Sequence, residues 1–330
     1  MSGLPEGVTE AVPYAIPLTE RFRRVSVREG VLLRGPAGWG DFCPFAEYGD
    51  DEARAWLATA VEAATVGWPA PVRDDIAVNA IVPAVTPERA RELVAASGCR
   101  TAKVKVADHP ASLAEDEARV EAVRDALGPD GEVRVDANAA WDVEAAVTHL
   151  RALDRAAGGL EYAEQPCATI EELAAVRRRV DVPIAADESI RRAEDPLRVA
   201  VAGAADVAVL KCTPLGGVRR ALAVAQAVAD AADLPVVVSS ALETGVGLAA
   251  QLAFAGALPR LAHACGLGTL SLLADDVLAP GQHLRPRDGR LPVLRTPPAP
   301  DPAALERLRQ PDADRAAWWL ARLARVTALR

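Results

Sequence analysis

The sequence predicts an α/β protein: a (β/α)8-type barrel, modified to (β/α)7β, that carries an N-terminal α+β capping domain. From about residue 76, short apolar, β-branched runs alternate with Ala-rich amphipathic stretches, the pattern of a parallel sheet covered by helices. Eight such units occupy about 200 residues, close to the length of about 250 residues typical of a closed barrel. Residues 1–75 lack this alternation, so we expect them to form a separate domain.

Each barrel unit is justified by its own pattern. The predicted strands are 76–84, 101–107, 132–138, 160–166, 183–189, 207–212, 235–240 and, with the weakest pattern, 261–267. The predicted helices are 86–97, 112–127, 142–156, 169–179, 194–203, 217–231 and 245–257. Thr86, Asp142 and Thr169 each precede an acidic first turn, as helix N-caps do. No strong helix pattern follows the eighth strand, which is why the last unit is predicted to be incomplete.

The two ends of the chain differ from the barrel region, 76–284. Residues 21–45 (RFRRVSVREGVLLRGPAGWGDFCPF) predict an antiparallel meander with turns at 28–30 and 35–36, followed by a helix near 51–66. Residues 285–330 begin Pro-rich and end in an amphipathic helix near 312–327. We expect this C-terminal segment to pack back on the capping domain.

Composition excludes several function classes. The 330 residues carry a net charge of −9 and no basic cluster interleaved with aromatics, which argues against nucleic-acid or membrane partners. No uncharged apolar run reaches the roughly 18 residues of a membrane helix, and the acidic N-terminal stretch does not resemble a secretory signal. Five scattered cysteines without a C-x-x-C motif predict reduced thiols and a cytoplasmic location. Nothing in the sequence predicts the oligomeric state.

Three consecutive strands end in a carboxylate: Asp136, Glu164 and Asp187. A single acidic residue there usually caps the following helix, but active sites of barrels lie at these strand ends. Neighbouring strands are about 4.8 Å apart, so three inward carboxylates repel one another unless a cation lies between them. The four histidines lack ligand spacing, so the donors are oxygens and predict Mg²⁺ or Mn²⁺ rather than zinc.

Lysine is rare in this chain and falls beside these carboxylates. Of the 37 basic residues 34 are Arg, and the three lysines are Lys103 and Lys105 on the second strand and Lys211 on the sixth. An isolated K-x-K strand normally presents its lysines to water, but both faces of a barrel strand are covered. Two adjacent ammonium groups lower each other's pKa, and a lysine in that state can serve as a general base.

Taken in order, K-x-K, D-x-N, E-Q-P, D-E-S and a lysine on the sixth strand resemble the muconate-lactonizing branch of the enolase superfamily. The segment 38–45 (GWGDFCPF) is similar to the G-W-G-E segment of that family's capping domain, so the resemblance covers most of the chain. It implies that Mg²⁺ is held by Asp136, Glu164 and Asp187. It implies that Lys105 is the acid/base, that Lys103 tunes its pKa, and that Lys211 lies across the site. Asn138 and Glu188 match positions that support the metal ligands, although ordinary turn or cap roles fit them equally well.

Within this branch the chain is most similar to the o-succinylbenzoate synthases of menaquinone biosynthesis. The segments 236–248 and 266–273 resemble that family's segments for binding the substrate carboxylate, so Ser239, Ser240 and the Gly266–Gly268 backbone are expected to donate hydrogen bonds to a small anionic substrate. A helix N-terminus that merely caps itself is the alternative for 239–245. The resemblance implies a syn dehydration of 2-succinyl-6-hydroxy-2,4-cyclohexadiene-1-carboxylate to o-succinylbenzoate.

Other activities stay open from the sequence. Lysines on both sides of the site also suit an N-acylamino-acid racemase, or a protein with both activities. Residues 265–269 (CGLGT) lack the acidic D-x-D pair of dipeptide epimerases, which makes that activity, like cycloisomerisation, less favoured. A barrel that binds without catalysis and a Schiff-base lysine enzyme are further alternatives; three adjacent carboxylates have no purpose in the latter.

Overall fold

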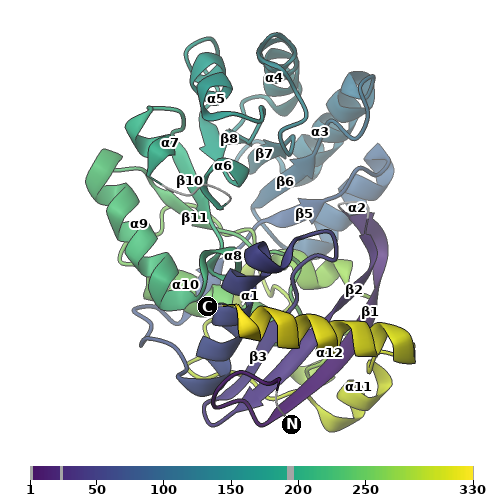
Figure 1. Cartoon of the computed structure of the whole chain (residues 1–330). Helices are drawn as coiled ribbons and strands as arrows, with labels where there is room; N and C mark the ends of the chain where they lie inside the picture. Colours follow the sequence, from purple (N-terminus) through teal and green to yellow (C-terminus); the bar gives the residue numbers. More distant parts are fainter. Residues whose placement is uncertain (1–2, 23–24, 192–196, 330) are drawn as a thin grey trace.

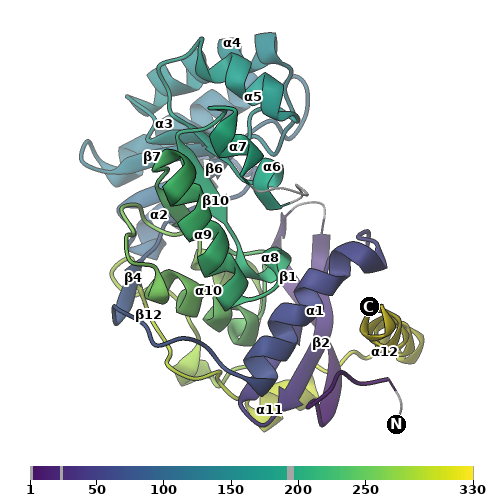
Figure 2. The same ribbon diagram turned by 60° about the vertical axis from the view of Figure 1, so that its left-hand side comes forward.

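The computed structural model describes residues 3–22, 25–191 and 197–329. Figure 1 shows a helix-covered parallel sheet above a smaller part in which both termini lie. The smaller part is built on an antiparallel meander of β1 (Glu10–Phe22), β2 (Val25–Gly35) and β3 (Gly38–Phe42). Helix α1 (Asp50–Thr65) packs on β2 and β3, and the C-terminal α12 (Ala313–Ala328) packs against α1, β1 and β2 (Figure 2).

One of the two turns predicted in the meander is wrong. The turn at 35–36 is confirmed, because Gly35 pairs with Gly38 across it. Residues 28–30, in contrast, lie inside β2, and Gly30 pairs with Tyr14 of β1. Glycine is needed at position 30 because the neighbouring side chains leave no room for a Cβ, which would lie 2.7 Å from the Tyr14 hydroxyl and 2.8 Å from the Cys43 Cβ. Residues 23–24, between β1 and β2, lie outside the described residues.

The larger part is a parallel sheet of seven strands that neighbour one another in chain order. These strands are β5 (Ala80–Val82), β6 (Thr101–Lys105), β7 (Glu132–Asp136), β8 (Tyr162–Glu164), β9 (Ile184–Ala186), β10 (Val207–Leu210) and β11 (Val236–Val238). The first predicted strand is divided: its start, β4 (Asp75–Ala77), pairs with β12 (Arg290–Pro292) instead of with the barrel. Strand β4 crosses the expected domain boundary at 75/76. The division of the chain at 75/76 and 284/285 therefore stays a proposal.

The eighth strand is reduced to a two-residue bridge that closes the barrel. Gly266 bridges to Ser239 at the end of β11, and Cys265 bridges to Val78 beside β5. Backbone hydrogen bonds of 2.8 Å from Gly266 to Val238 and 2.7 Å from Cys265 to Ala77 support the closure. A 3-10 helix, η1 (Gly268–Leu272), follows instead of an α-helix. The fold is therefore a modified (β/α)8 barrel with an N-terminal cap, as the sequence predicts.

Most predicted helices lie within one or two residues of their expected bounds. They are α2 (Pro87–Ser97), α3 (Leu113–Leu127), α4 (Val143–Ala157), α5 (Ile170–Arg177), α9 (Val218–Ala232) and α10 (Gly245–Ala257). Thr86, Asp142 and Thr169 are confirmed as N-caps, and Thr169 forms a reciprocal capping box with Glu172. Of the predicted helix 194–203, the structure shows α7 (Arg198–Val201), whereas 194–196 lie outside the described residues. The sequence did not predict the following short helices: α6 (Glu188–Arg191), α8 (Cys212–Leu215), α11 (Pro302–Arg307) and η2 (Pro280–Gln282).

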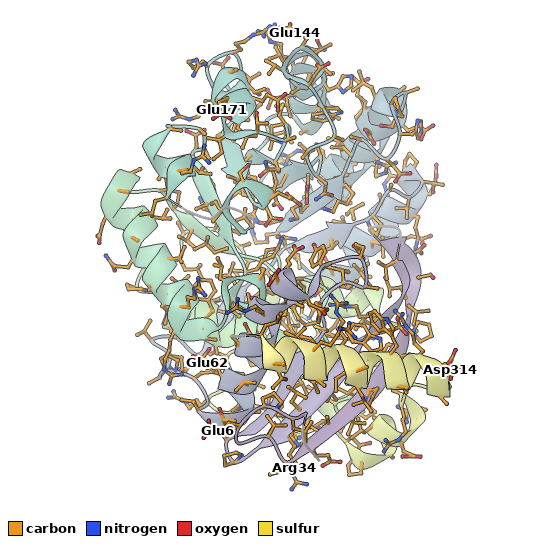
Figure 3. The ribbon with its side chains drawn as sticks, in the orientation of Figure 1. Glu6, Arg34, Glu62, Glu144, Glu171 and Asp314 are labelled. Atoms are coloured by element: carbon orange, nitrogen blue, oxygen red, sulfur yellow. The ribbon has the colours of Figure 1, made fainter. Side chains whose placement is uncertain are left out.

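The cap and the barrel are joined by packing and by hydrogen bonds. Helix α1 packs against α8 and α10 of the barrel, and α10 is buried over nearly its whole length. Glu62 of α1, labelled in Figure 3, accepts a hydrogen bond of 2.5 Å from the Val218 N–H and so supplies the side-chain cap that the start of α9 lacks. Within the described part of the chain, no helix is both long and apolar enough to cross a bilayer.

Candidate active site at the carboxyl ends of the barrel strands

Strand register brings the predicted site residues together. Lys105 is paired with Asp136 across β6 and β7, and Asp136 is paired with Glu164 across β7 and β8. Asp187 and Lys211 each follow the last residue of their strand, β9 and β10. Because parallel strands present their carboxyl ends at one edge, all of these side chains meet at the same mouth of the barrel.

The lysines and carboxylates form a continuous ion-pair cluster. Lys103 Nζ lies 2.8 and 2.9 Å from the two carboxylate oxygens of Glu164, and 3.4 Å from Asp136 Oδ2. Lys105 forms a close ion pair with Asp136, and Lys211 forms one with Asp187. Three positive and three negative groups thus share one buried site. Such charges are tolerated in an interior only when they are paired.

Burial makes the protonation of this cluster uneven. Burial raises the pKa of Glu164 to about 7, and the charges of Asp136 and Asp187 add to the rise. Burial acts in the same direction on Asp136, but Lys105 and Lys103 outweigh it and hold that pKa below its ordinary value.

Lys103 and Lys105 of β6 differ in the direction in which their surroundings shift the pKa. Burial would lower the pKa of Lys103, but the carboxylates of Glu164 and Asp136 raise it above its ordinary value. For Lys105, burial lowers the pKa, and the charge of Lys103 adds to that effect despite the opposing effect of Asp136. Lys103 is therefore the lysine that keeps its proton, and Lys105 is the one that releases it more readily.

A cavity opens on this cluster. Of the residues predicted from the sequence for the site, Leu267 and Gly268 do not line it, and the others do: Lys103, Lys105, Asp136, Asn138, Glu164, Asp187, Glu188, Lys211, Ser239, Ser240 and Gly266. Phe45 of the cap and Ile81, Ala241, Leu242 and Thr269 of the barrel complete the wall. The cavity therefore has a charged floor at the strand ends and a partly apolar wall shared by the cap.

Asn138 and Glu188 adjoin the cluster. The Asn138 side chain accepts a hydrogen bond of 2.6 Å from Lys105 and donates one of 3.4 Å to Glu188. Its backbone N–H donates to Asp136 over 3.0 Å. Asn138 therefore holds Lys105 and Asp136 in a fixed relation.

The residues expected to bind a substrate anion are not equivalent. The Gly266 N–H donates to Val238, and the Ser240 N–H donates to Gly266, so neither is directed at the cavity. The Ser240 hydroxyl lies 2.6 Å from Glu243 and 2.7 Å from Thr269. The Ser239 hydroxyl forms no hydrogen bond to the described residues, which leaves it available to a ligand.

Sequence reasoning missed Gln165, the middle residue of the E-Q-P motif. It is fully buried, and its side-chain oxygen accepts hydrogen bonds from the backbone N–H groups of Asp187 and Ser189 over 3.0 and 3.1 Å. Its amide donates to the Ser189 hydroxyl over 2.6 Å. Its own backbone has φ of 43°, a left-handed conformation that costs energy in a residue other than glycine. Gln165 therefore fixes the strand end that carries Asp187.

A second missed group lies behind Lys105. The buried Arg119 of α3 donates to the carbonyl oxygens of Lys105 (3.0 Å) and Val85 (2.7 Å), which ties the ends of β6 and β5 together. Asp116 holds Arg119 at 2.7 Å and accepts from the Ala107 N–H at 2.9 Å. An i, i+3 acidic–basic pair in a helix usually lies on its surface, so this pattern gave no signal in the sequence.

The donor set suits a hard divalent cation. Asp136, Glu164 and Asp187 are each 1% exposed, and burial, together with the charges of the other two carboxylates, raises the pKa of Glu164. Among the described residues, however, no three acidic, His or Cys side chains converge as metal ligands do, because the ammonium groups of the lysines lie against the carboxylates. The three carboxylates provide the oxygen donors that Mg²⁺ prefers. In this structure their negative charges are balanced by the ammonium groups of the lysines.

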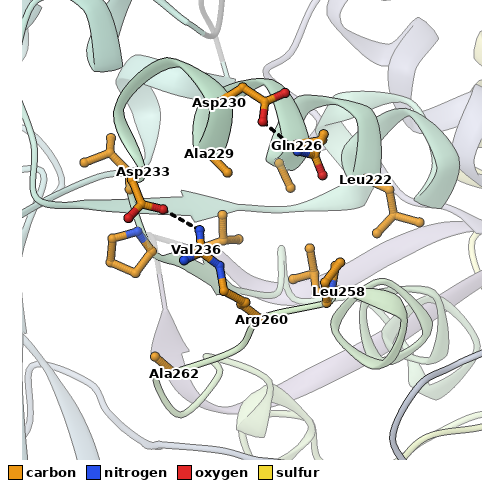
Figure 4. A pocket seen from close by; sticks show the side chains of 13 residues that line it. Leu222, Gln226, Ala229, Asp230, Asp233, Val236, Leu258, Arg260 and Ala262 are labelled. Carbon is orange, nitrogen blue, oxygen red and sulfur yellow. Dashed lines mark hydrogen bonds and ion pairs between the residues drawn. The ribbon is translucent and has the colours of Figure 1, made fainter.

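A second cavity lies between α9 and residues 258–262 (Figure 4). Asp233 and Arg260 form an ion pair at its edge, and most of its remaining lining is apolar. None of the residues predicted for the site lines it, so we place the chemistry at the strand ends.

Two family models match the chain. The model described as "Enolase C-terminal domain-like" matches residues 86–298, and the "Enolase N-terminal domain-like" model matches residues 13–64. The o-succinylbenzoate synthase of Thermobifida fusca (strain YX) is 61% identical over 315 residues, which cover 96% of this chain and 95% of that protein. That of Mycolicibacterium smegmatis (strain ATCC 700084 / mc(2)155) is 55% identical over 316 residues, with coverage of 96% and 94%.

Solved structures agree on the fold. Muconate lactonizing enzyme from Pseudomonas fluorescens, complexed with muconolactone, superposes with a TM-score of 0.77 at 24% identity and covers 94% of this chain and 100% of its own. An isomerase from Streptomyces coelicolor A3(2) gives a TM-score of 0.73 at 27% identity, with coverage of 91% and 96%.

The Gln165 assignment predicts a loss of stability. Gln165→Met keeps the approximate volume but leaves the N–H groups of Asp187 and Ser189 buried without acceptors. At about 1–3 kcal/mol for each unsatisfied group, the free energy of unfolding in a urea titration should fall by at least about 2 kcal/mol. Gln226→Met is the matched control, because Gln226 donates to Asp230 on an exposed face of α9. Equal effects of the two substitutions would contradict the assignment.

Proposed function

The chain belongs to the o-succinylbenzoate synthases of the enolase superfamily and is a dehydratase, and on this premise we propose the reaction and the residues that carry it out. The substrate is a small molecule, which we identify as 2-succinyl-6-hydroxy-2,4-cyclohexadiene-1-carboxylate. The enzyme converts it to o-succinylbenzoate by syn elimination of water, and the pathway served is menaquinone biosynthesis. The structural observation that supports this reaction best is that the three lysines meet Asp136, Glu164 and Asp187 in one buried cluster at the strand ends.

Lys105 serves as the base and then as the acid. Its neutral amine takes the proton from the ring carbon that bears the carboxylate, and the electron pair of that C–H bond passes into an enediolate. The resulting ammonium then gives the proton to the hydroxyl on the adjacent carbon, whose C–O bond breaks as water leaves and the ring becomes aromatic. Lys105 ends the cycle neutral, as it began. A syn elimination needs only this one group, because both events occur on one face of the ring.

The other two lysines keep their protons in this scheme. Lys103, whose pKa is raised by Glu164 and Asp136, holds a positive charge beside Lys105 and thereby favours the neutral form of Lys105. Lys211 approaches from β10, and its ammonium stabilises the negative charge that develops on the substrate.

We propose Mg²⁺, or Mn²⁺ in its place, as the cofactor. Asp136, Glu164 and Asp187 would hold it, with Asn138 and Glu188 supporting the ligands. When bound, the ion supplies positive charge for the oxygens of the substrate carboxylate. The Ser239 hydroxyl would donate to the other anionic end of the substrate. Gly266 would permit this, since a Cβ there would lie 2.7 Å from the Ser239 Oγ. We place the enzyme in the cytoplasm, in keeping with five buried free cysteines.

Comparing two substrates in D₂O tests the reaction. With Mg²⁺ present, we expect the cyclohexadiene substrate to be converted to o-succinylbenzoate, measured by the rise of aromatic absorbance. N-acylamino acids, the substrates of the racemase alternative, should exchange their α-proton for deuterium much more slowly, as followed by NMR. Rapid exchange of N-acylamino acids without any dehydration would contradict the proposal.

The role of Lys105 predicts the outcome of a charge-conserving substitution. Lys105→Arg keeps a cation beside Asp136, but guanidinium does not release a proton. We expect kcat/KM for dehydration to fall by about 10²–10⁴, the usual contribution of general acid–base catalysis.

The matched control for this substitution is Arg91→Lys, which exchanges the same two residue types in an exposed pair with Asp125 and should leave kcat/KM unchanged. Retention of wild-type turnover by Lys105→Arg would show that Lys105 acts only as a charge.

A further inference from the structure

A single buried arginine of the cap contacts both walls of the candidate site. Arg28 of β2 is 2% exposed, and its Nε donates to the Leu242 carbonyl over 2.8 Å. Its Nη2 donates to Ala241 over 3.4 Å and also to the Cys43 carbonyl. Leu242 and Ala241 belong to the loop after β11, whereas Cys43 follows β3 of the cap. One guanidinium thus joins two segments that are about 200 residues apart in the chain.

The groups that Arg28 holds are those that line the cavity. Ala241 and Leu242 form part of the barrel wall, and Phe45 forms the cap's contribution. The Arg28 guanidinium lies over the Phe45 ring, with 4.6 Å between its carbon and the ring centroid, a favourable cation–π distance. Arg28 therefore contributes directly to the relative position of Phe45 and Leu242.

The loop needs to be held, because its backbone is strained. Leu242 has φ of 65°, a conformation that a residue with a branched side chain rarely adopts. Its N–H donates to the Ser240 hydroxyl over 3.0 Å, so Arg28 fixes the carbonyl side of the turn and Ser240 fixes the amide side.

The cap also holds the far end of the loop. Asp41 of β3 accepts hydrogen bonds from the Thr244 N–H and hydroxyl over 3.0 and 2.9 Å, and from the Tyr14 hydroxyl over 2.9 Å. Once Arg28 is removed, Asp41 still anchors Thr244 and the Ala241 N–H still donates to Glu243 over 2.8 Å, so it is the carbonyl side of the turn at 241–242 that loses its partner. This makes Arg28 the specific support of the cavity wall within a larger contact.

We propose that Arg28 is a positioning residue that determines which substrates fit, by fixing Leu242 and Phe45 in the wall of the cavity. The inference rests on the proposed function, since it assigns substrate binding to this cavity. The two residues that it positions are apolar and take no part in the ion pairs of the lysine–carboxylate cluster, so we assign them contacts with the apolar part of the substrate and not with its reacting groups. Loss of Arg28 should therefore weaken binding of the ground state and the transition state alike.

Steady-state kinetics of Arg28→Lys, Leu242→Ala and the double variant test this. Lysine keeps the positive charge, but it lacks the planar guanidinium group that lets Arg28 donate to Leu242 and Ala241 of the barrel and to Cys43 of the cap at the same time. We expect Arg28→Lys to raise KM for the dehydration substrate about tenfold, the usual effect of a small loss of pocket contact, with kcat within about twofold of wild type. The two substitutions should raise KM by less than the product of their separate effects, because Arg28 acts through Leu242.

Arg124→Lys is the matched control. Arg124 of α3 donates to the carbonyl oxygens of Gly128 and Gly131 over 2.9 and 2.6 Å, at the opposite end of the barrel strands. The Arg124→Lys substitution should lower the free energy of unfolding without changing KM for the dehydration substrate. The proposal is overturned if Arg28→Lys behaves in the same way, or if the two KM effects multiply independently.

Two further outcomes are distinguishable. If the wild-type chain does not dehydrate the substrate but exchanges the α-proton of N-acylamino acids, the proposed function fails. The role of Arg28 is then decided by comparing KM for the N-acylamino acid between the wild type and Arg28→Lys. If Arg28→Lys does not fold, Leu242→Ala alone decides: an unchanged KM would show that the wall held by Arg28 does not contact the substrate.

Discussion

The site depends on one constraint: three carboxylates at the ends of adjacent parallel strands are too close to remain charged without cations among them. Strand register sets the spacing of Asp136 and Glu164, and burial removes the water that would otherwise screen them. In this structure the three lysines of the chain supply the positive charge. The same carboxylates offer an oxygen-only donor set for the divalent cation that we propose, and such an ion would compete with the lysines for the same oxygens. Lysine, unlike arginine, could lose its proton when a cation takes its place.

A second layer of polar residues, most of them buried, holds this cluster in place. Gln165 fixes the strand end at Asp187, Arg119 and Asp116 fix the strand end at Lys105, and Asn138 bridges Lys105 and Asp136. Left-handed residues follow the barrel strands at the site: Ala107, Asn138, Gln165 and Leu242. Such backbone strain persists only where surrounding contacts hold it. The cap adds its own support through Arg28 and Asp41, so the cavity is shaped by both parts of the molecule.

The fold and the centre of the site could be predicted because their signals are local or periodic. Strand and helix patterns, the N-caps and the one-per-strand carboxylates follow from short stretches of sequence. Apart from Asn138, the supporting residues could not be predicted, since their partners are distant in sequence and known only after folding: Arg28 meets Leu242, 214 positions away. The turn expected at 28–30 was wrong for the same reason. Gly30 looks like a turn residue, but its lack of a side chain serves close packing against Tyr14.

The central claim is that the buried carboxylates act by holding a divalent cation for the dehydration. The most direct measurement is the rate of o-succinylbenzoate formation by the wild-type chain after removal of metal with EDTA, followed by readdition of Mg²⁺. We expect turnover to disappear with EDTA and to return in proportion to the Mg²⁺ bound. Undiminished turnover in excess EDTA would contradict the account, because the lysines alone would then suffice for the reaction.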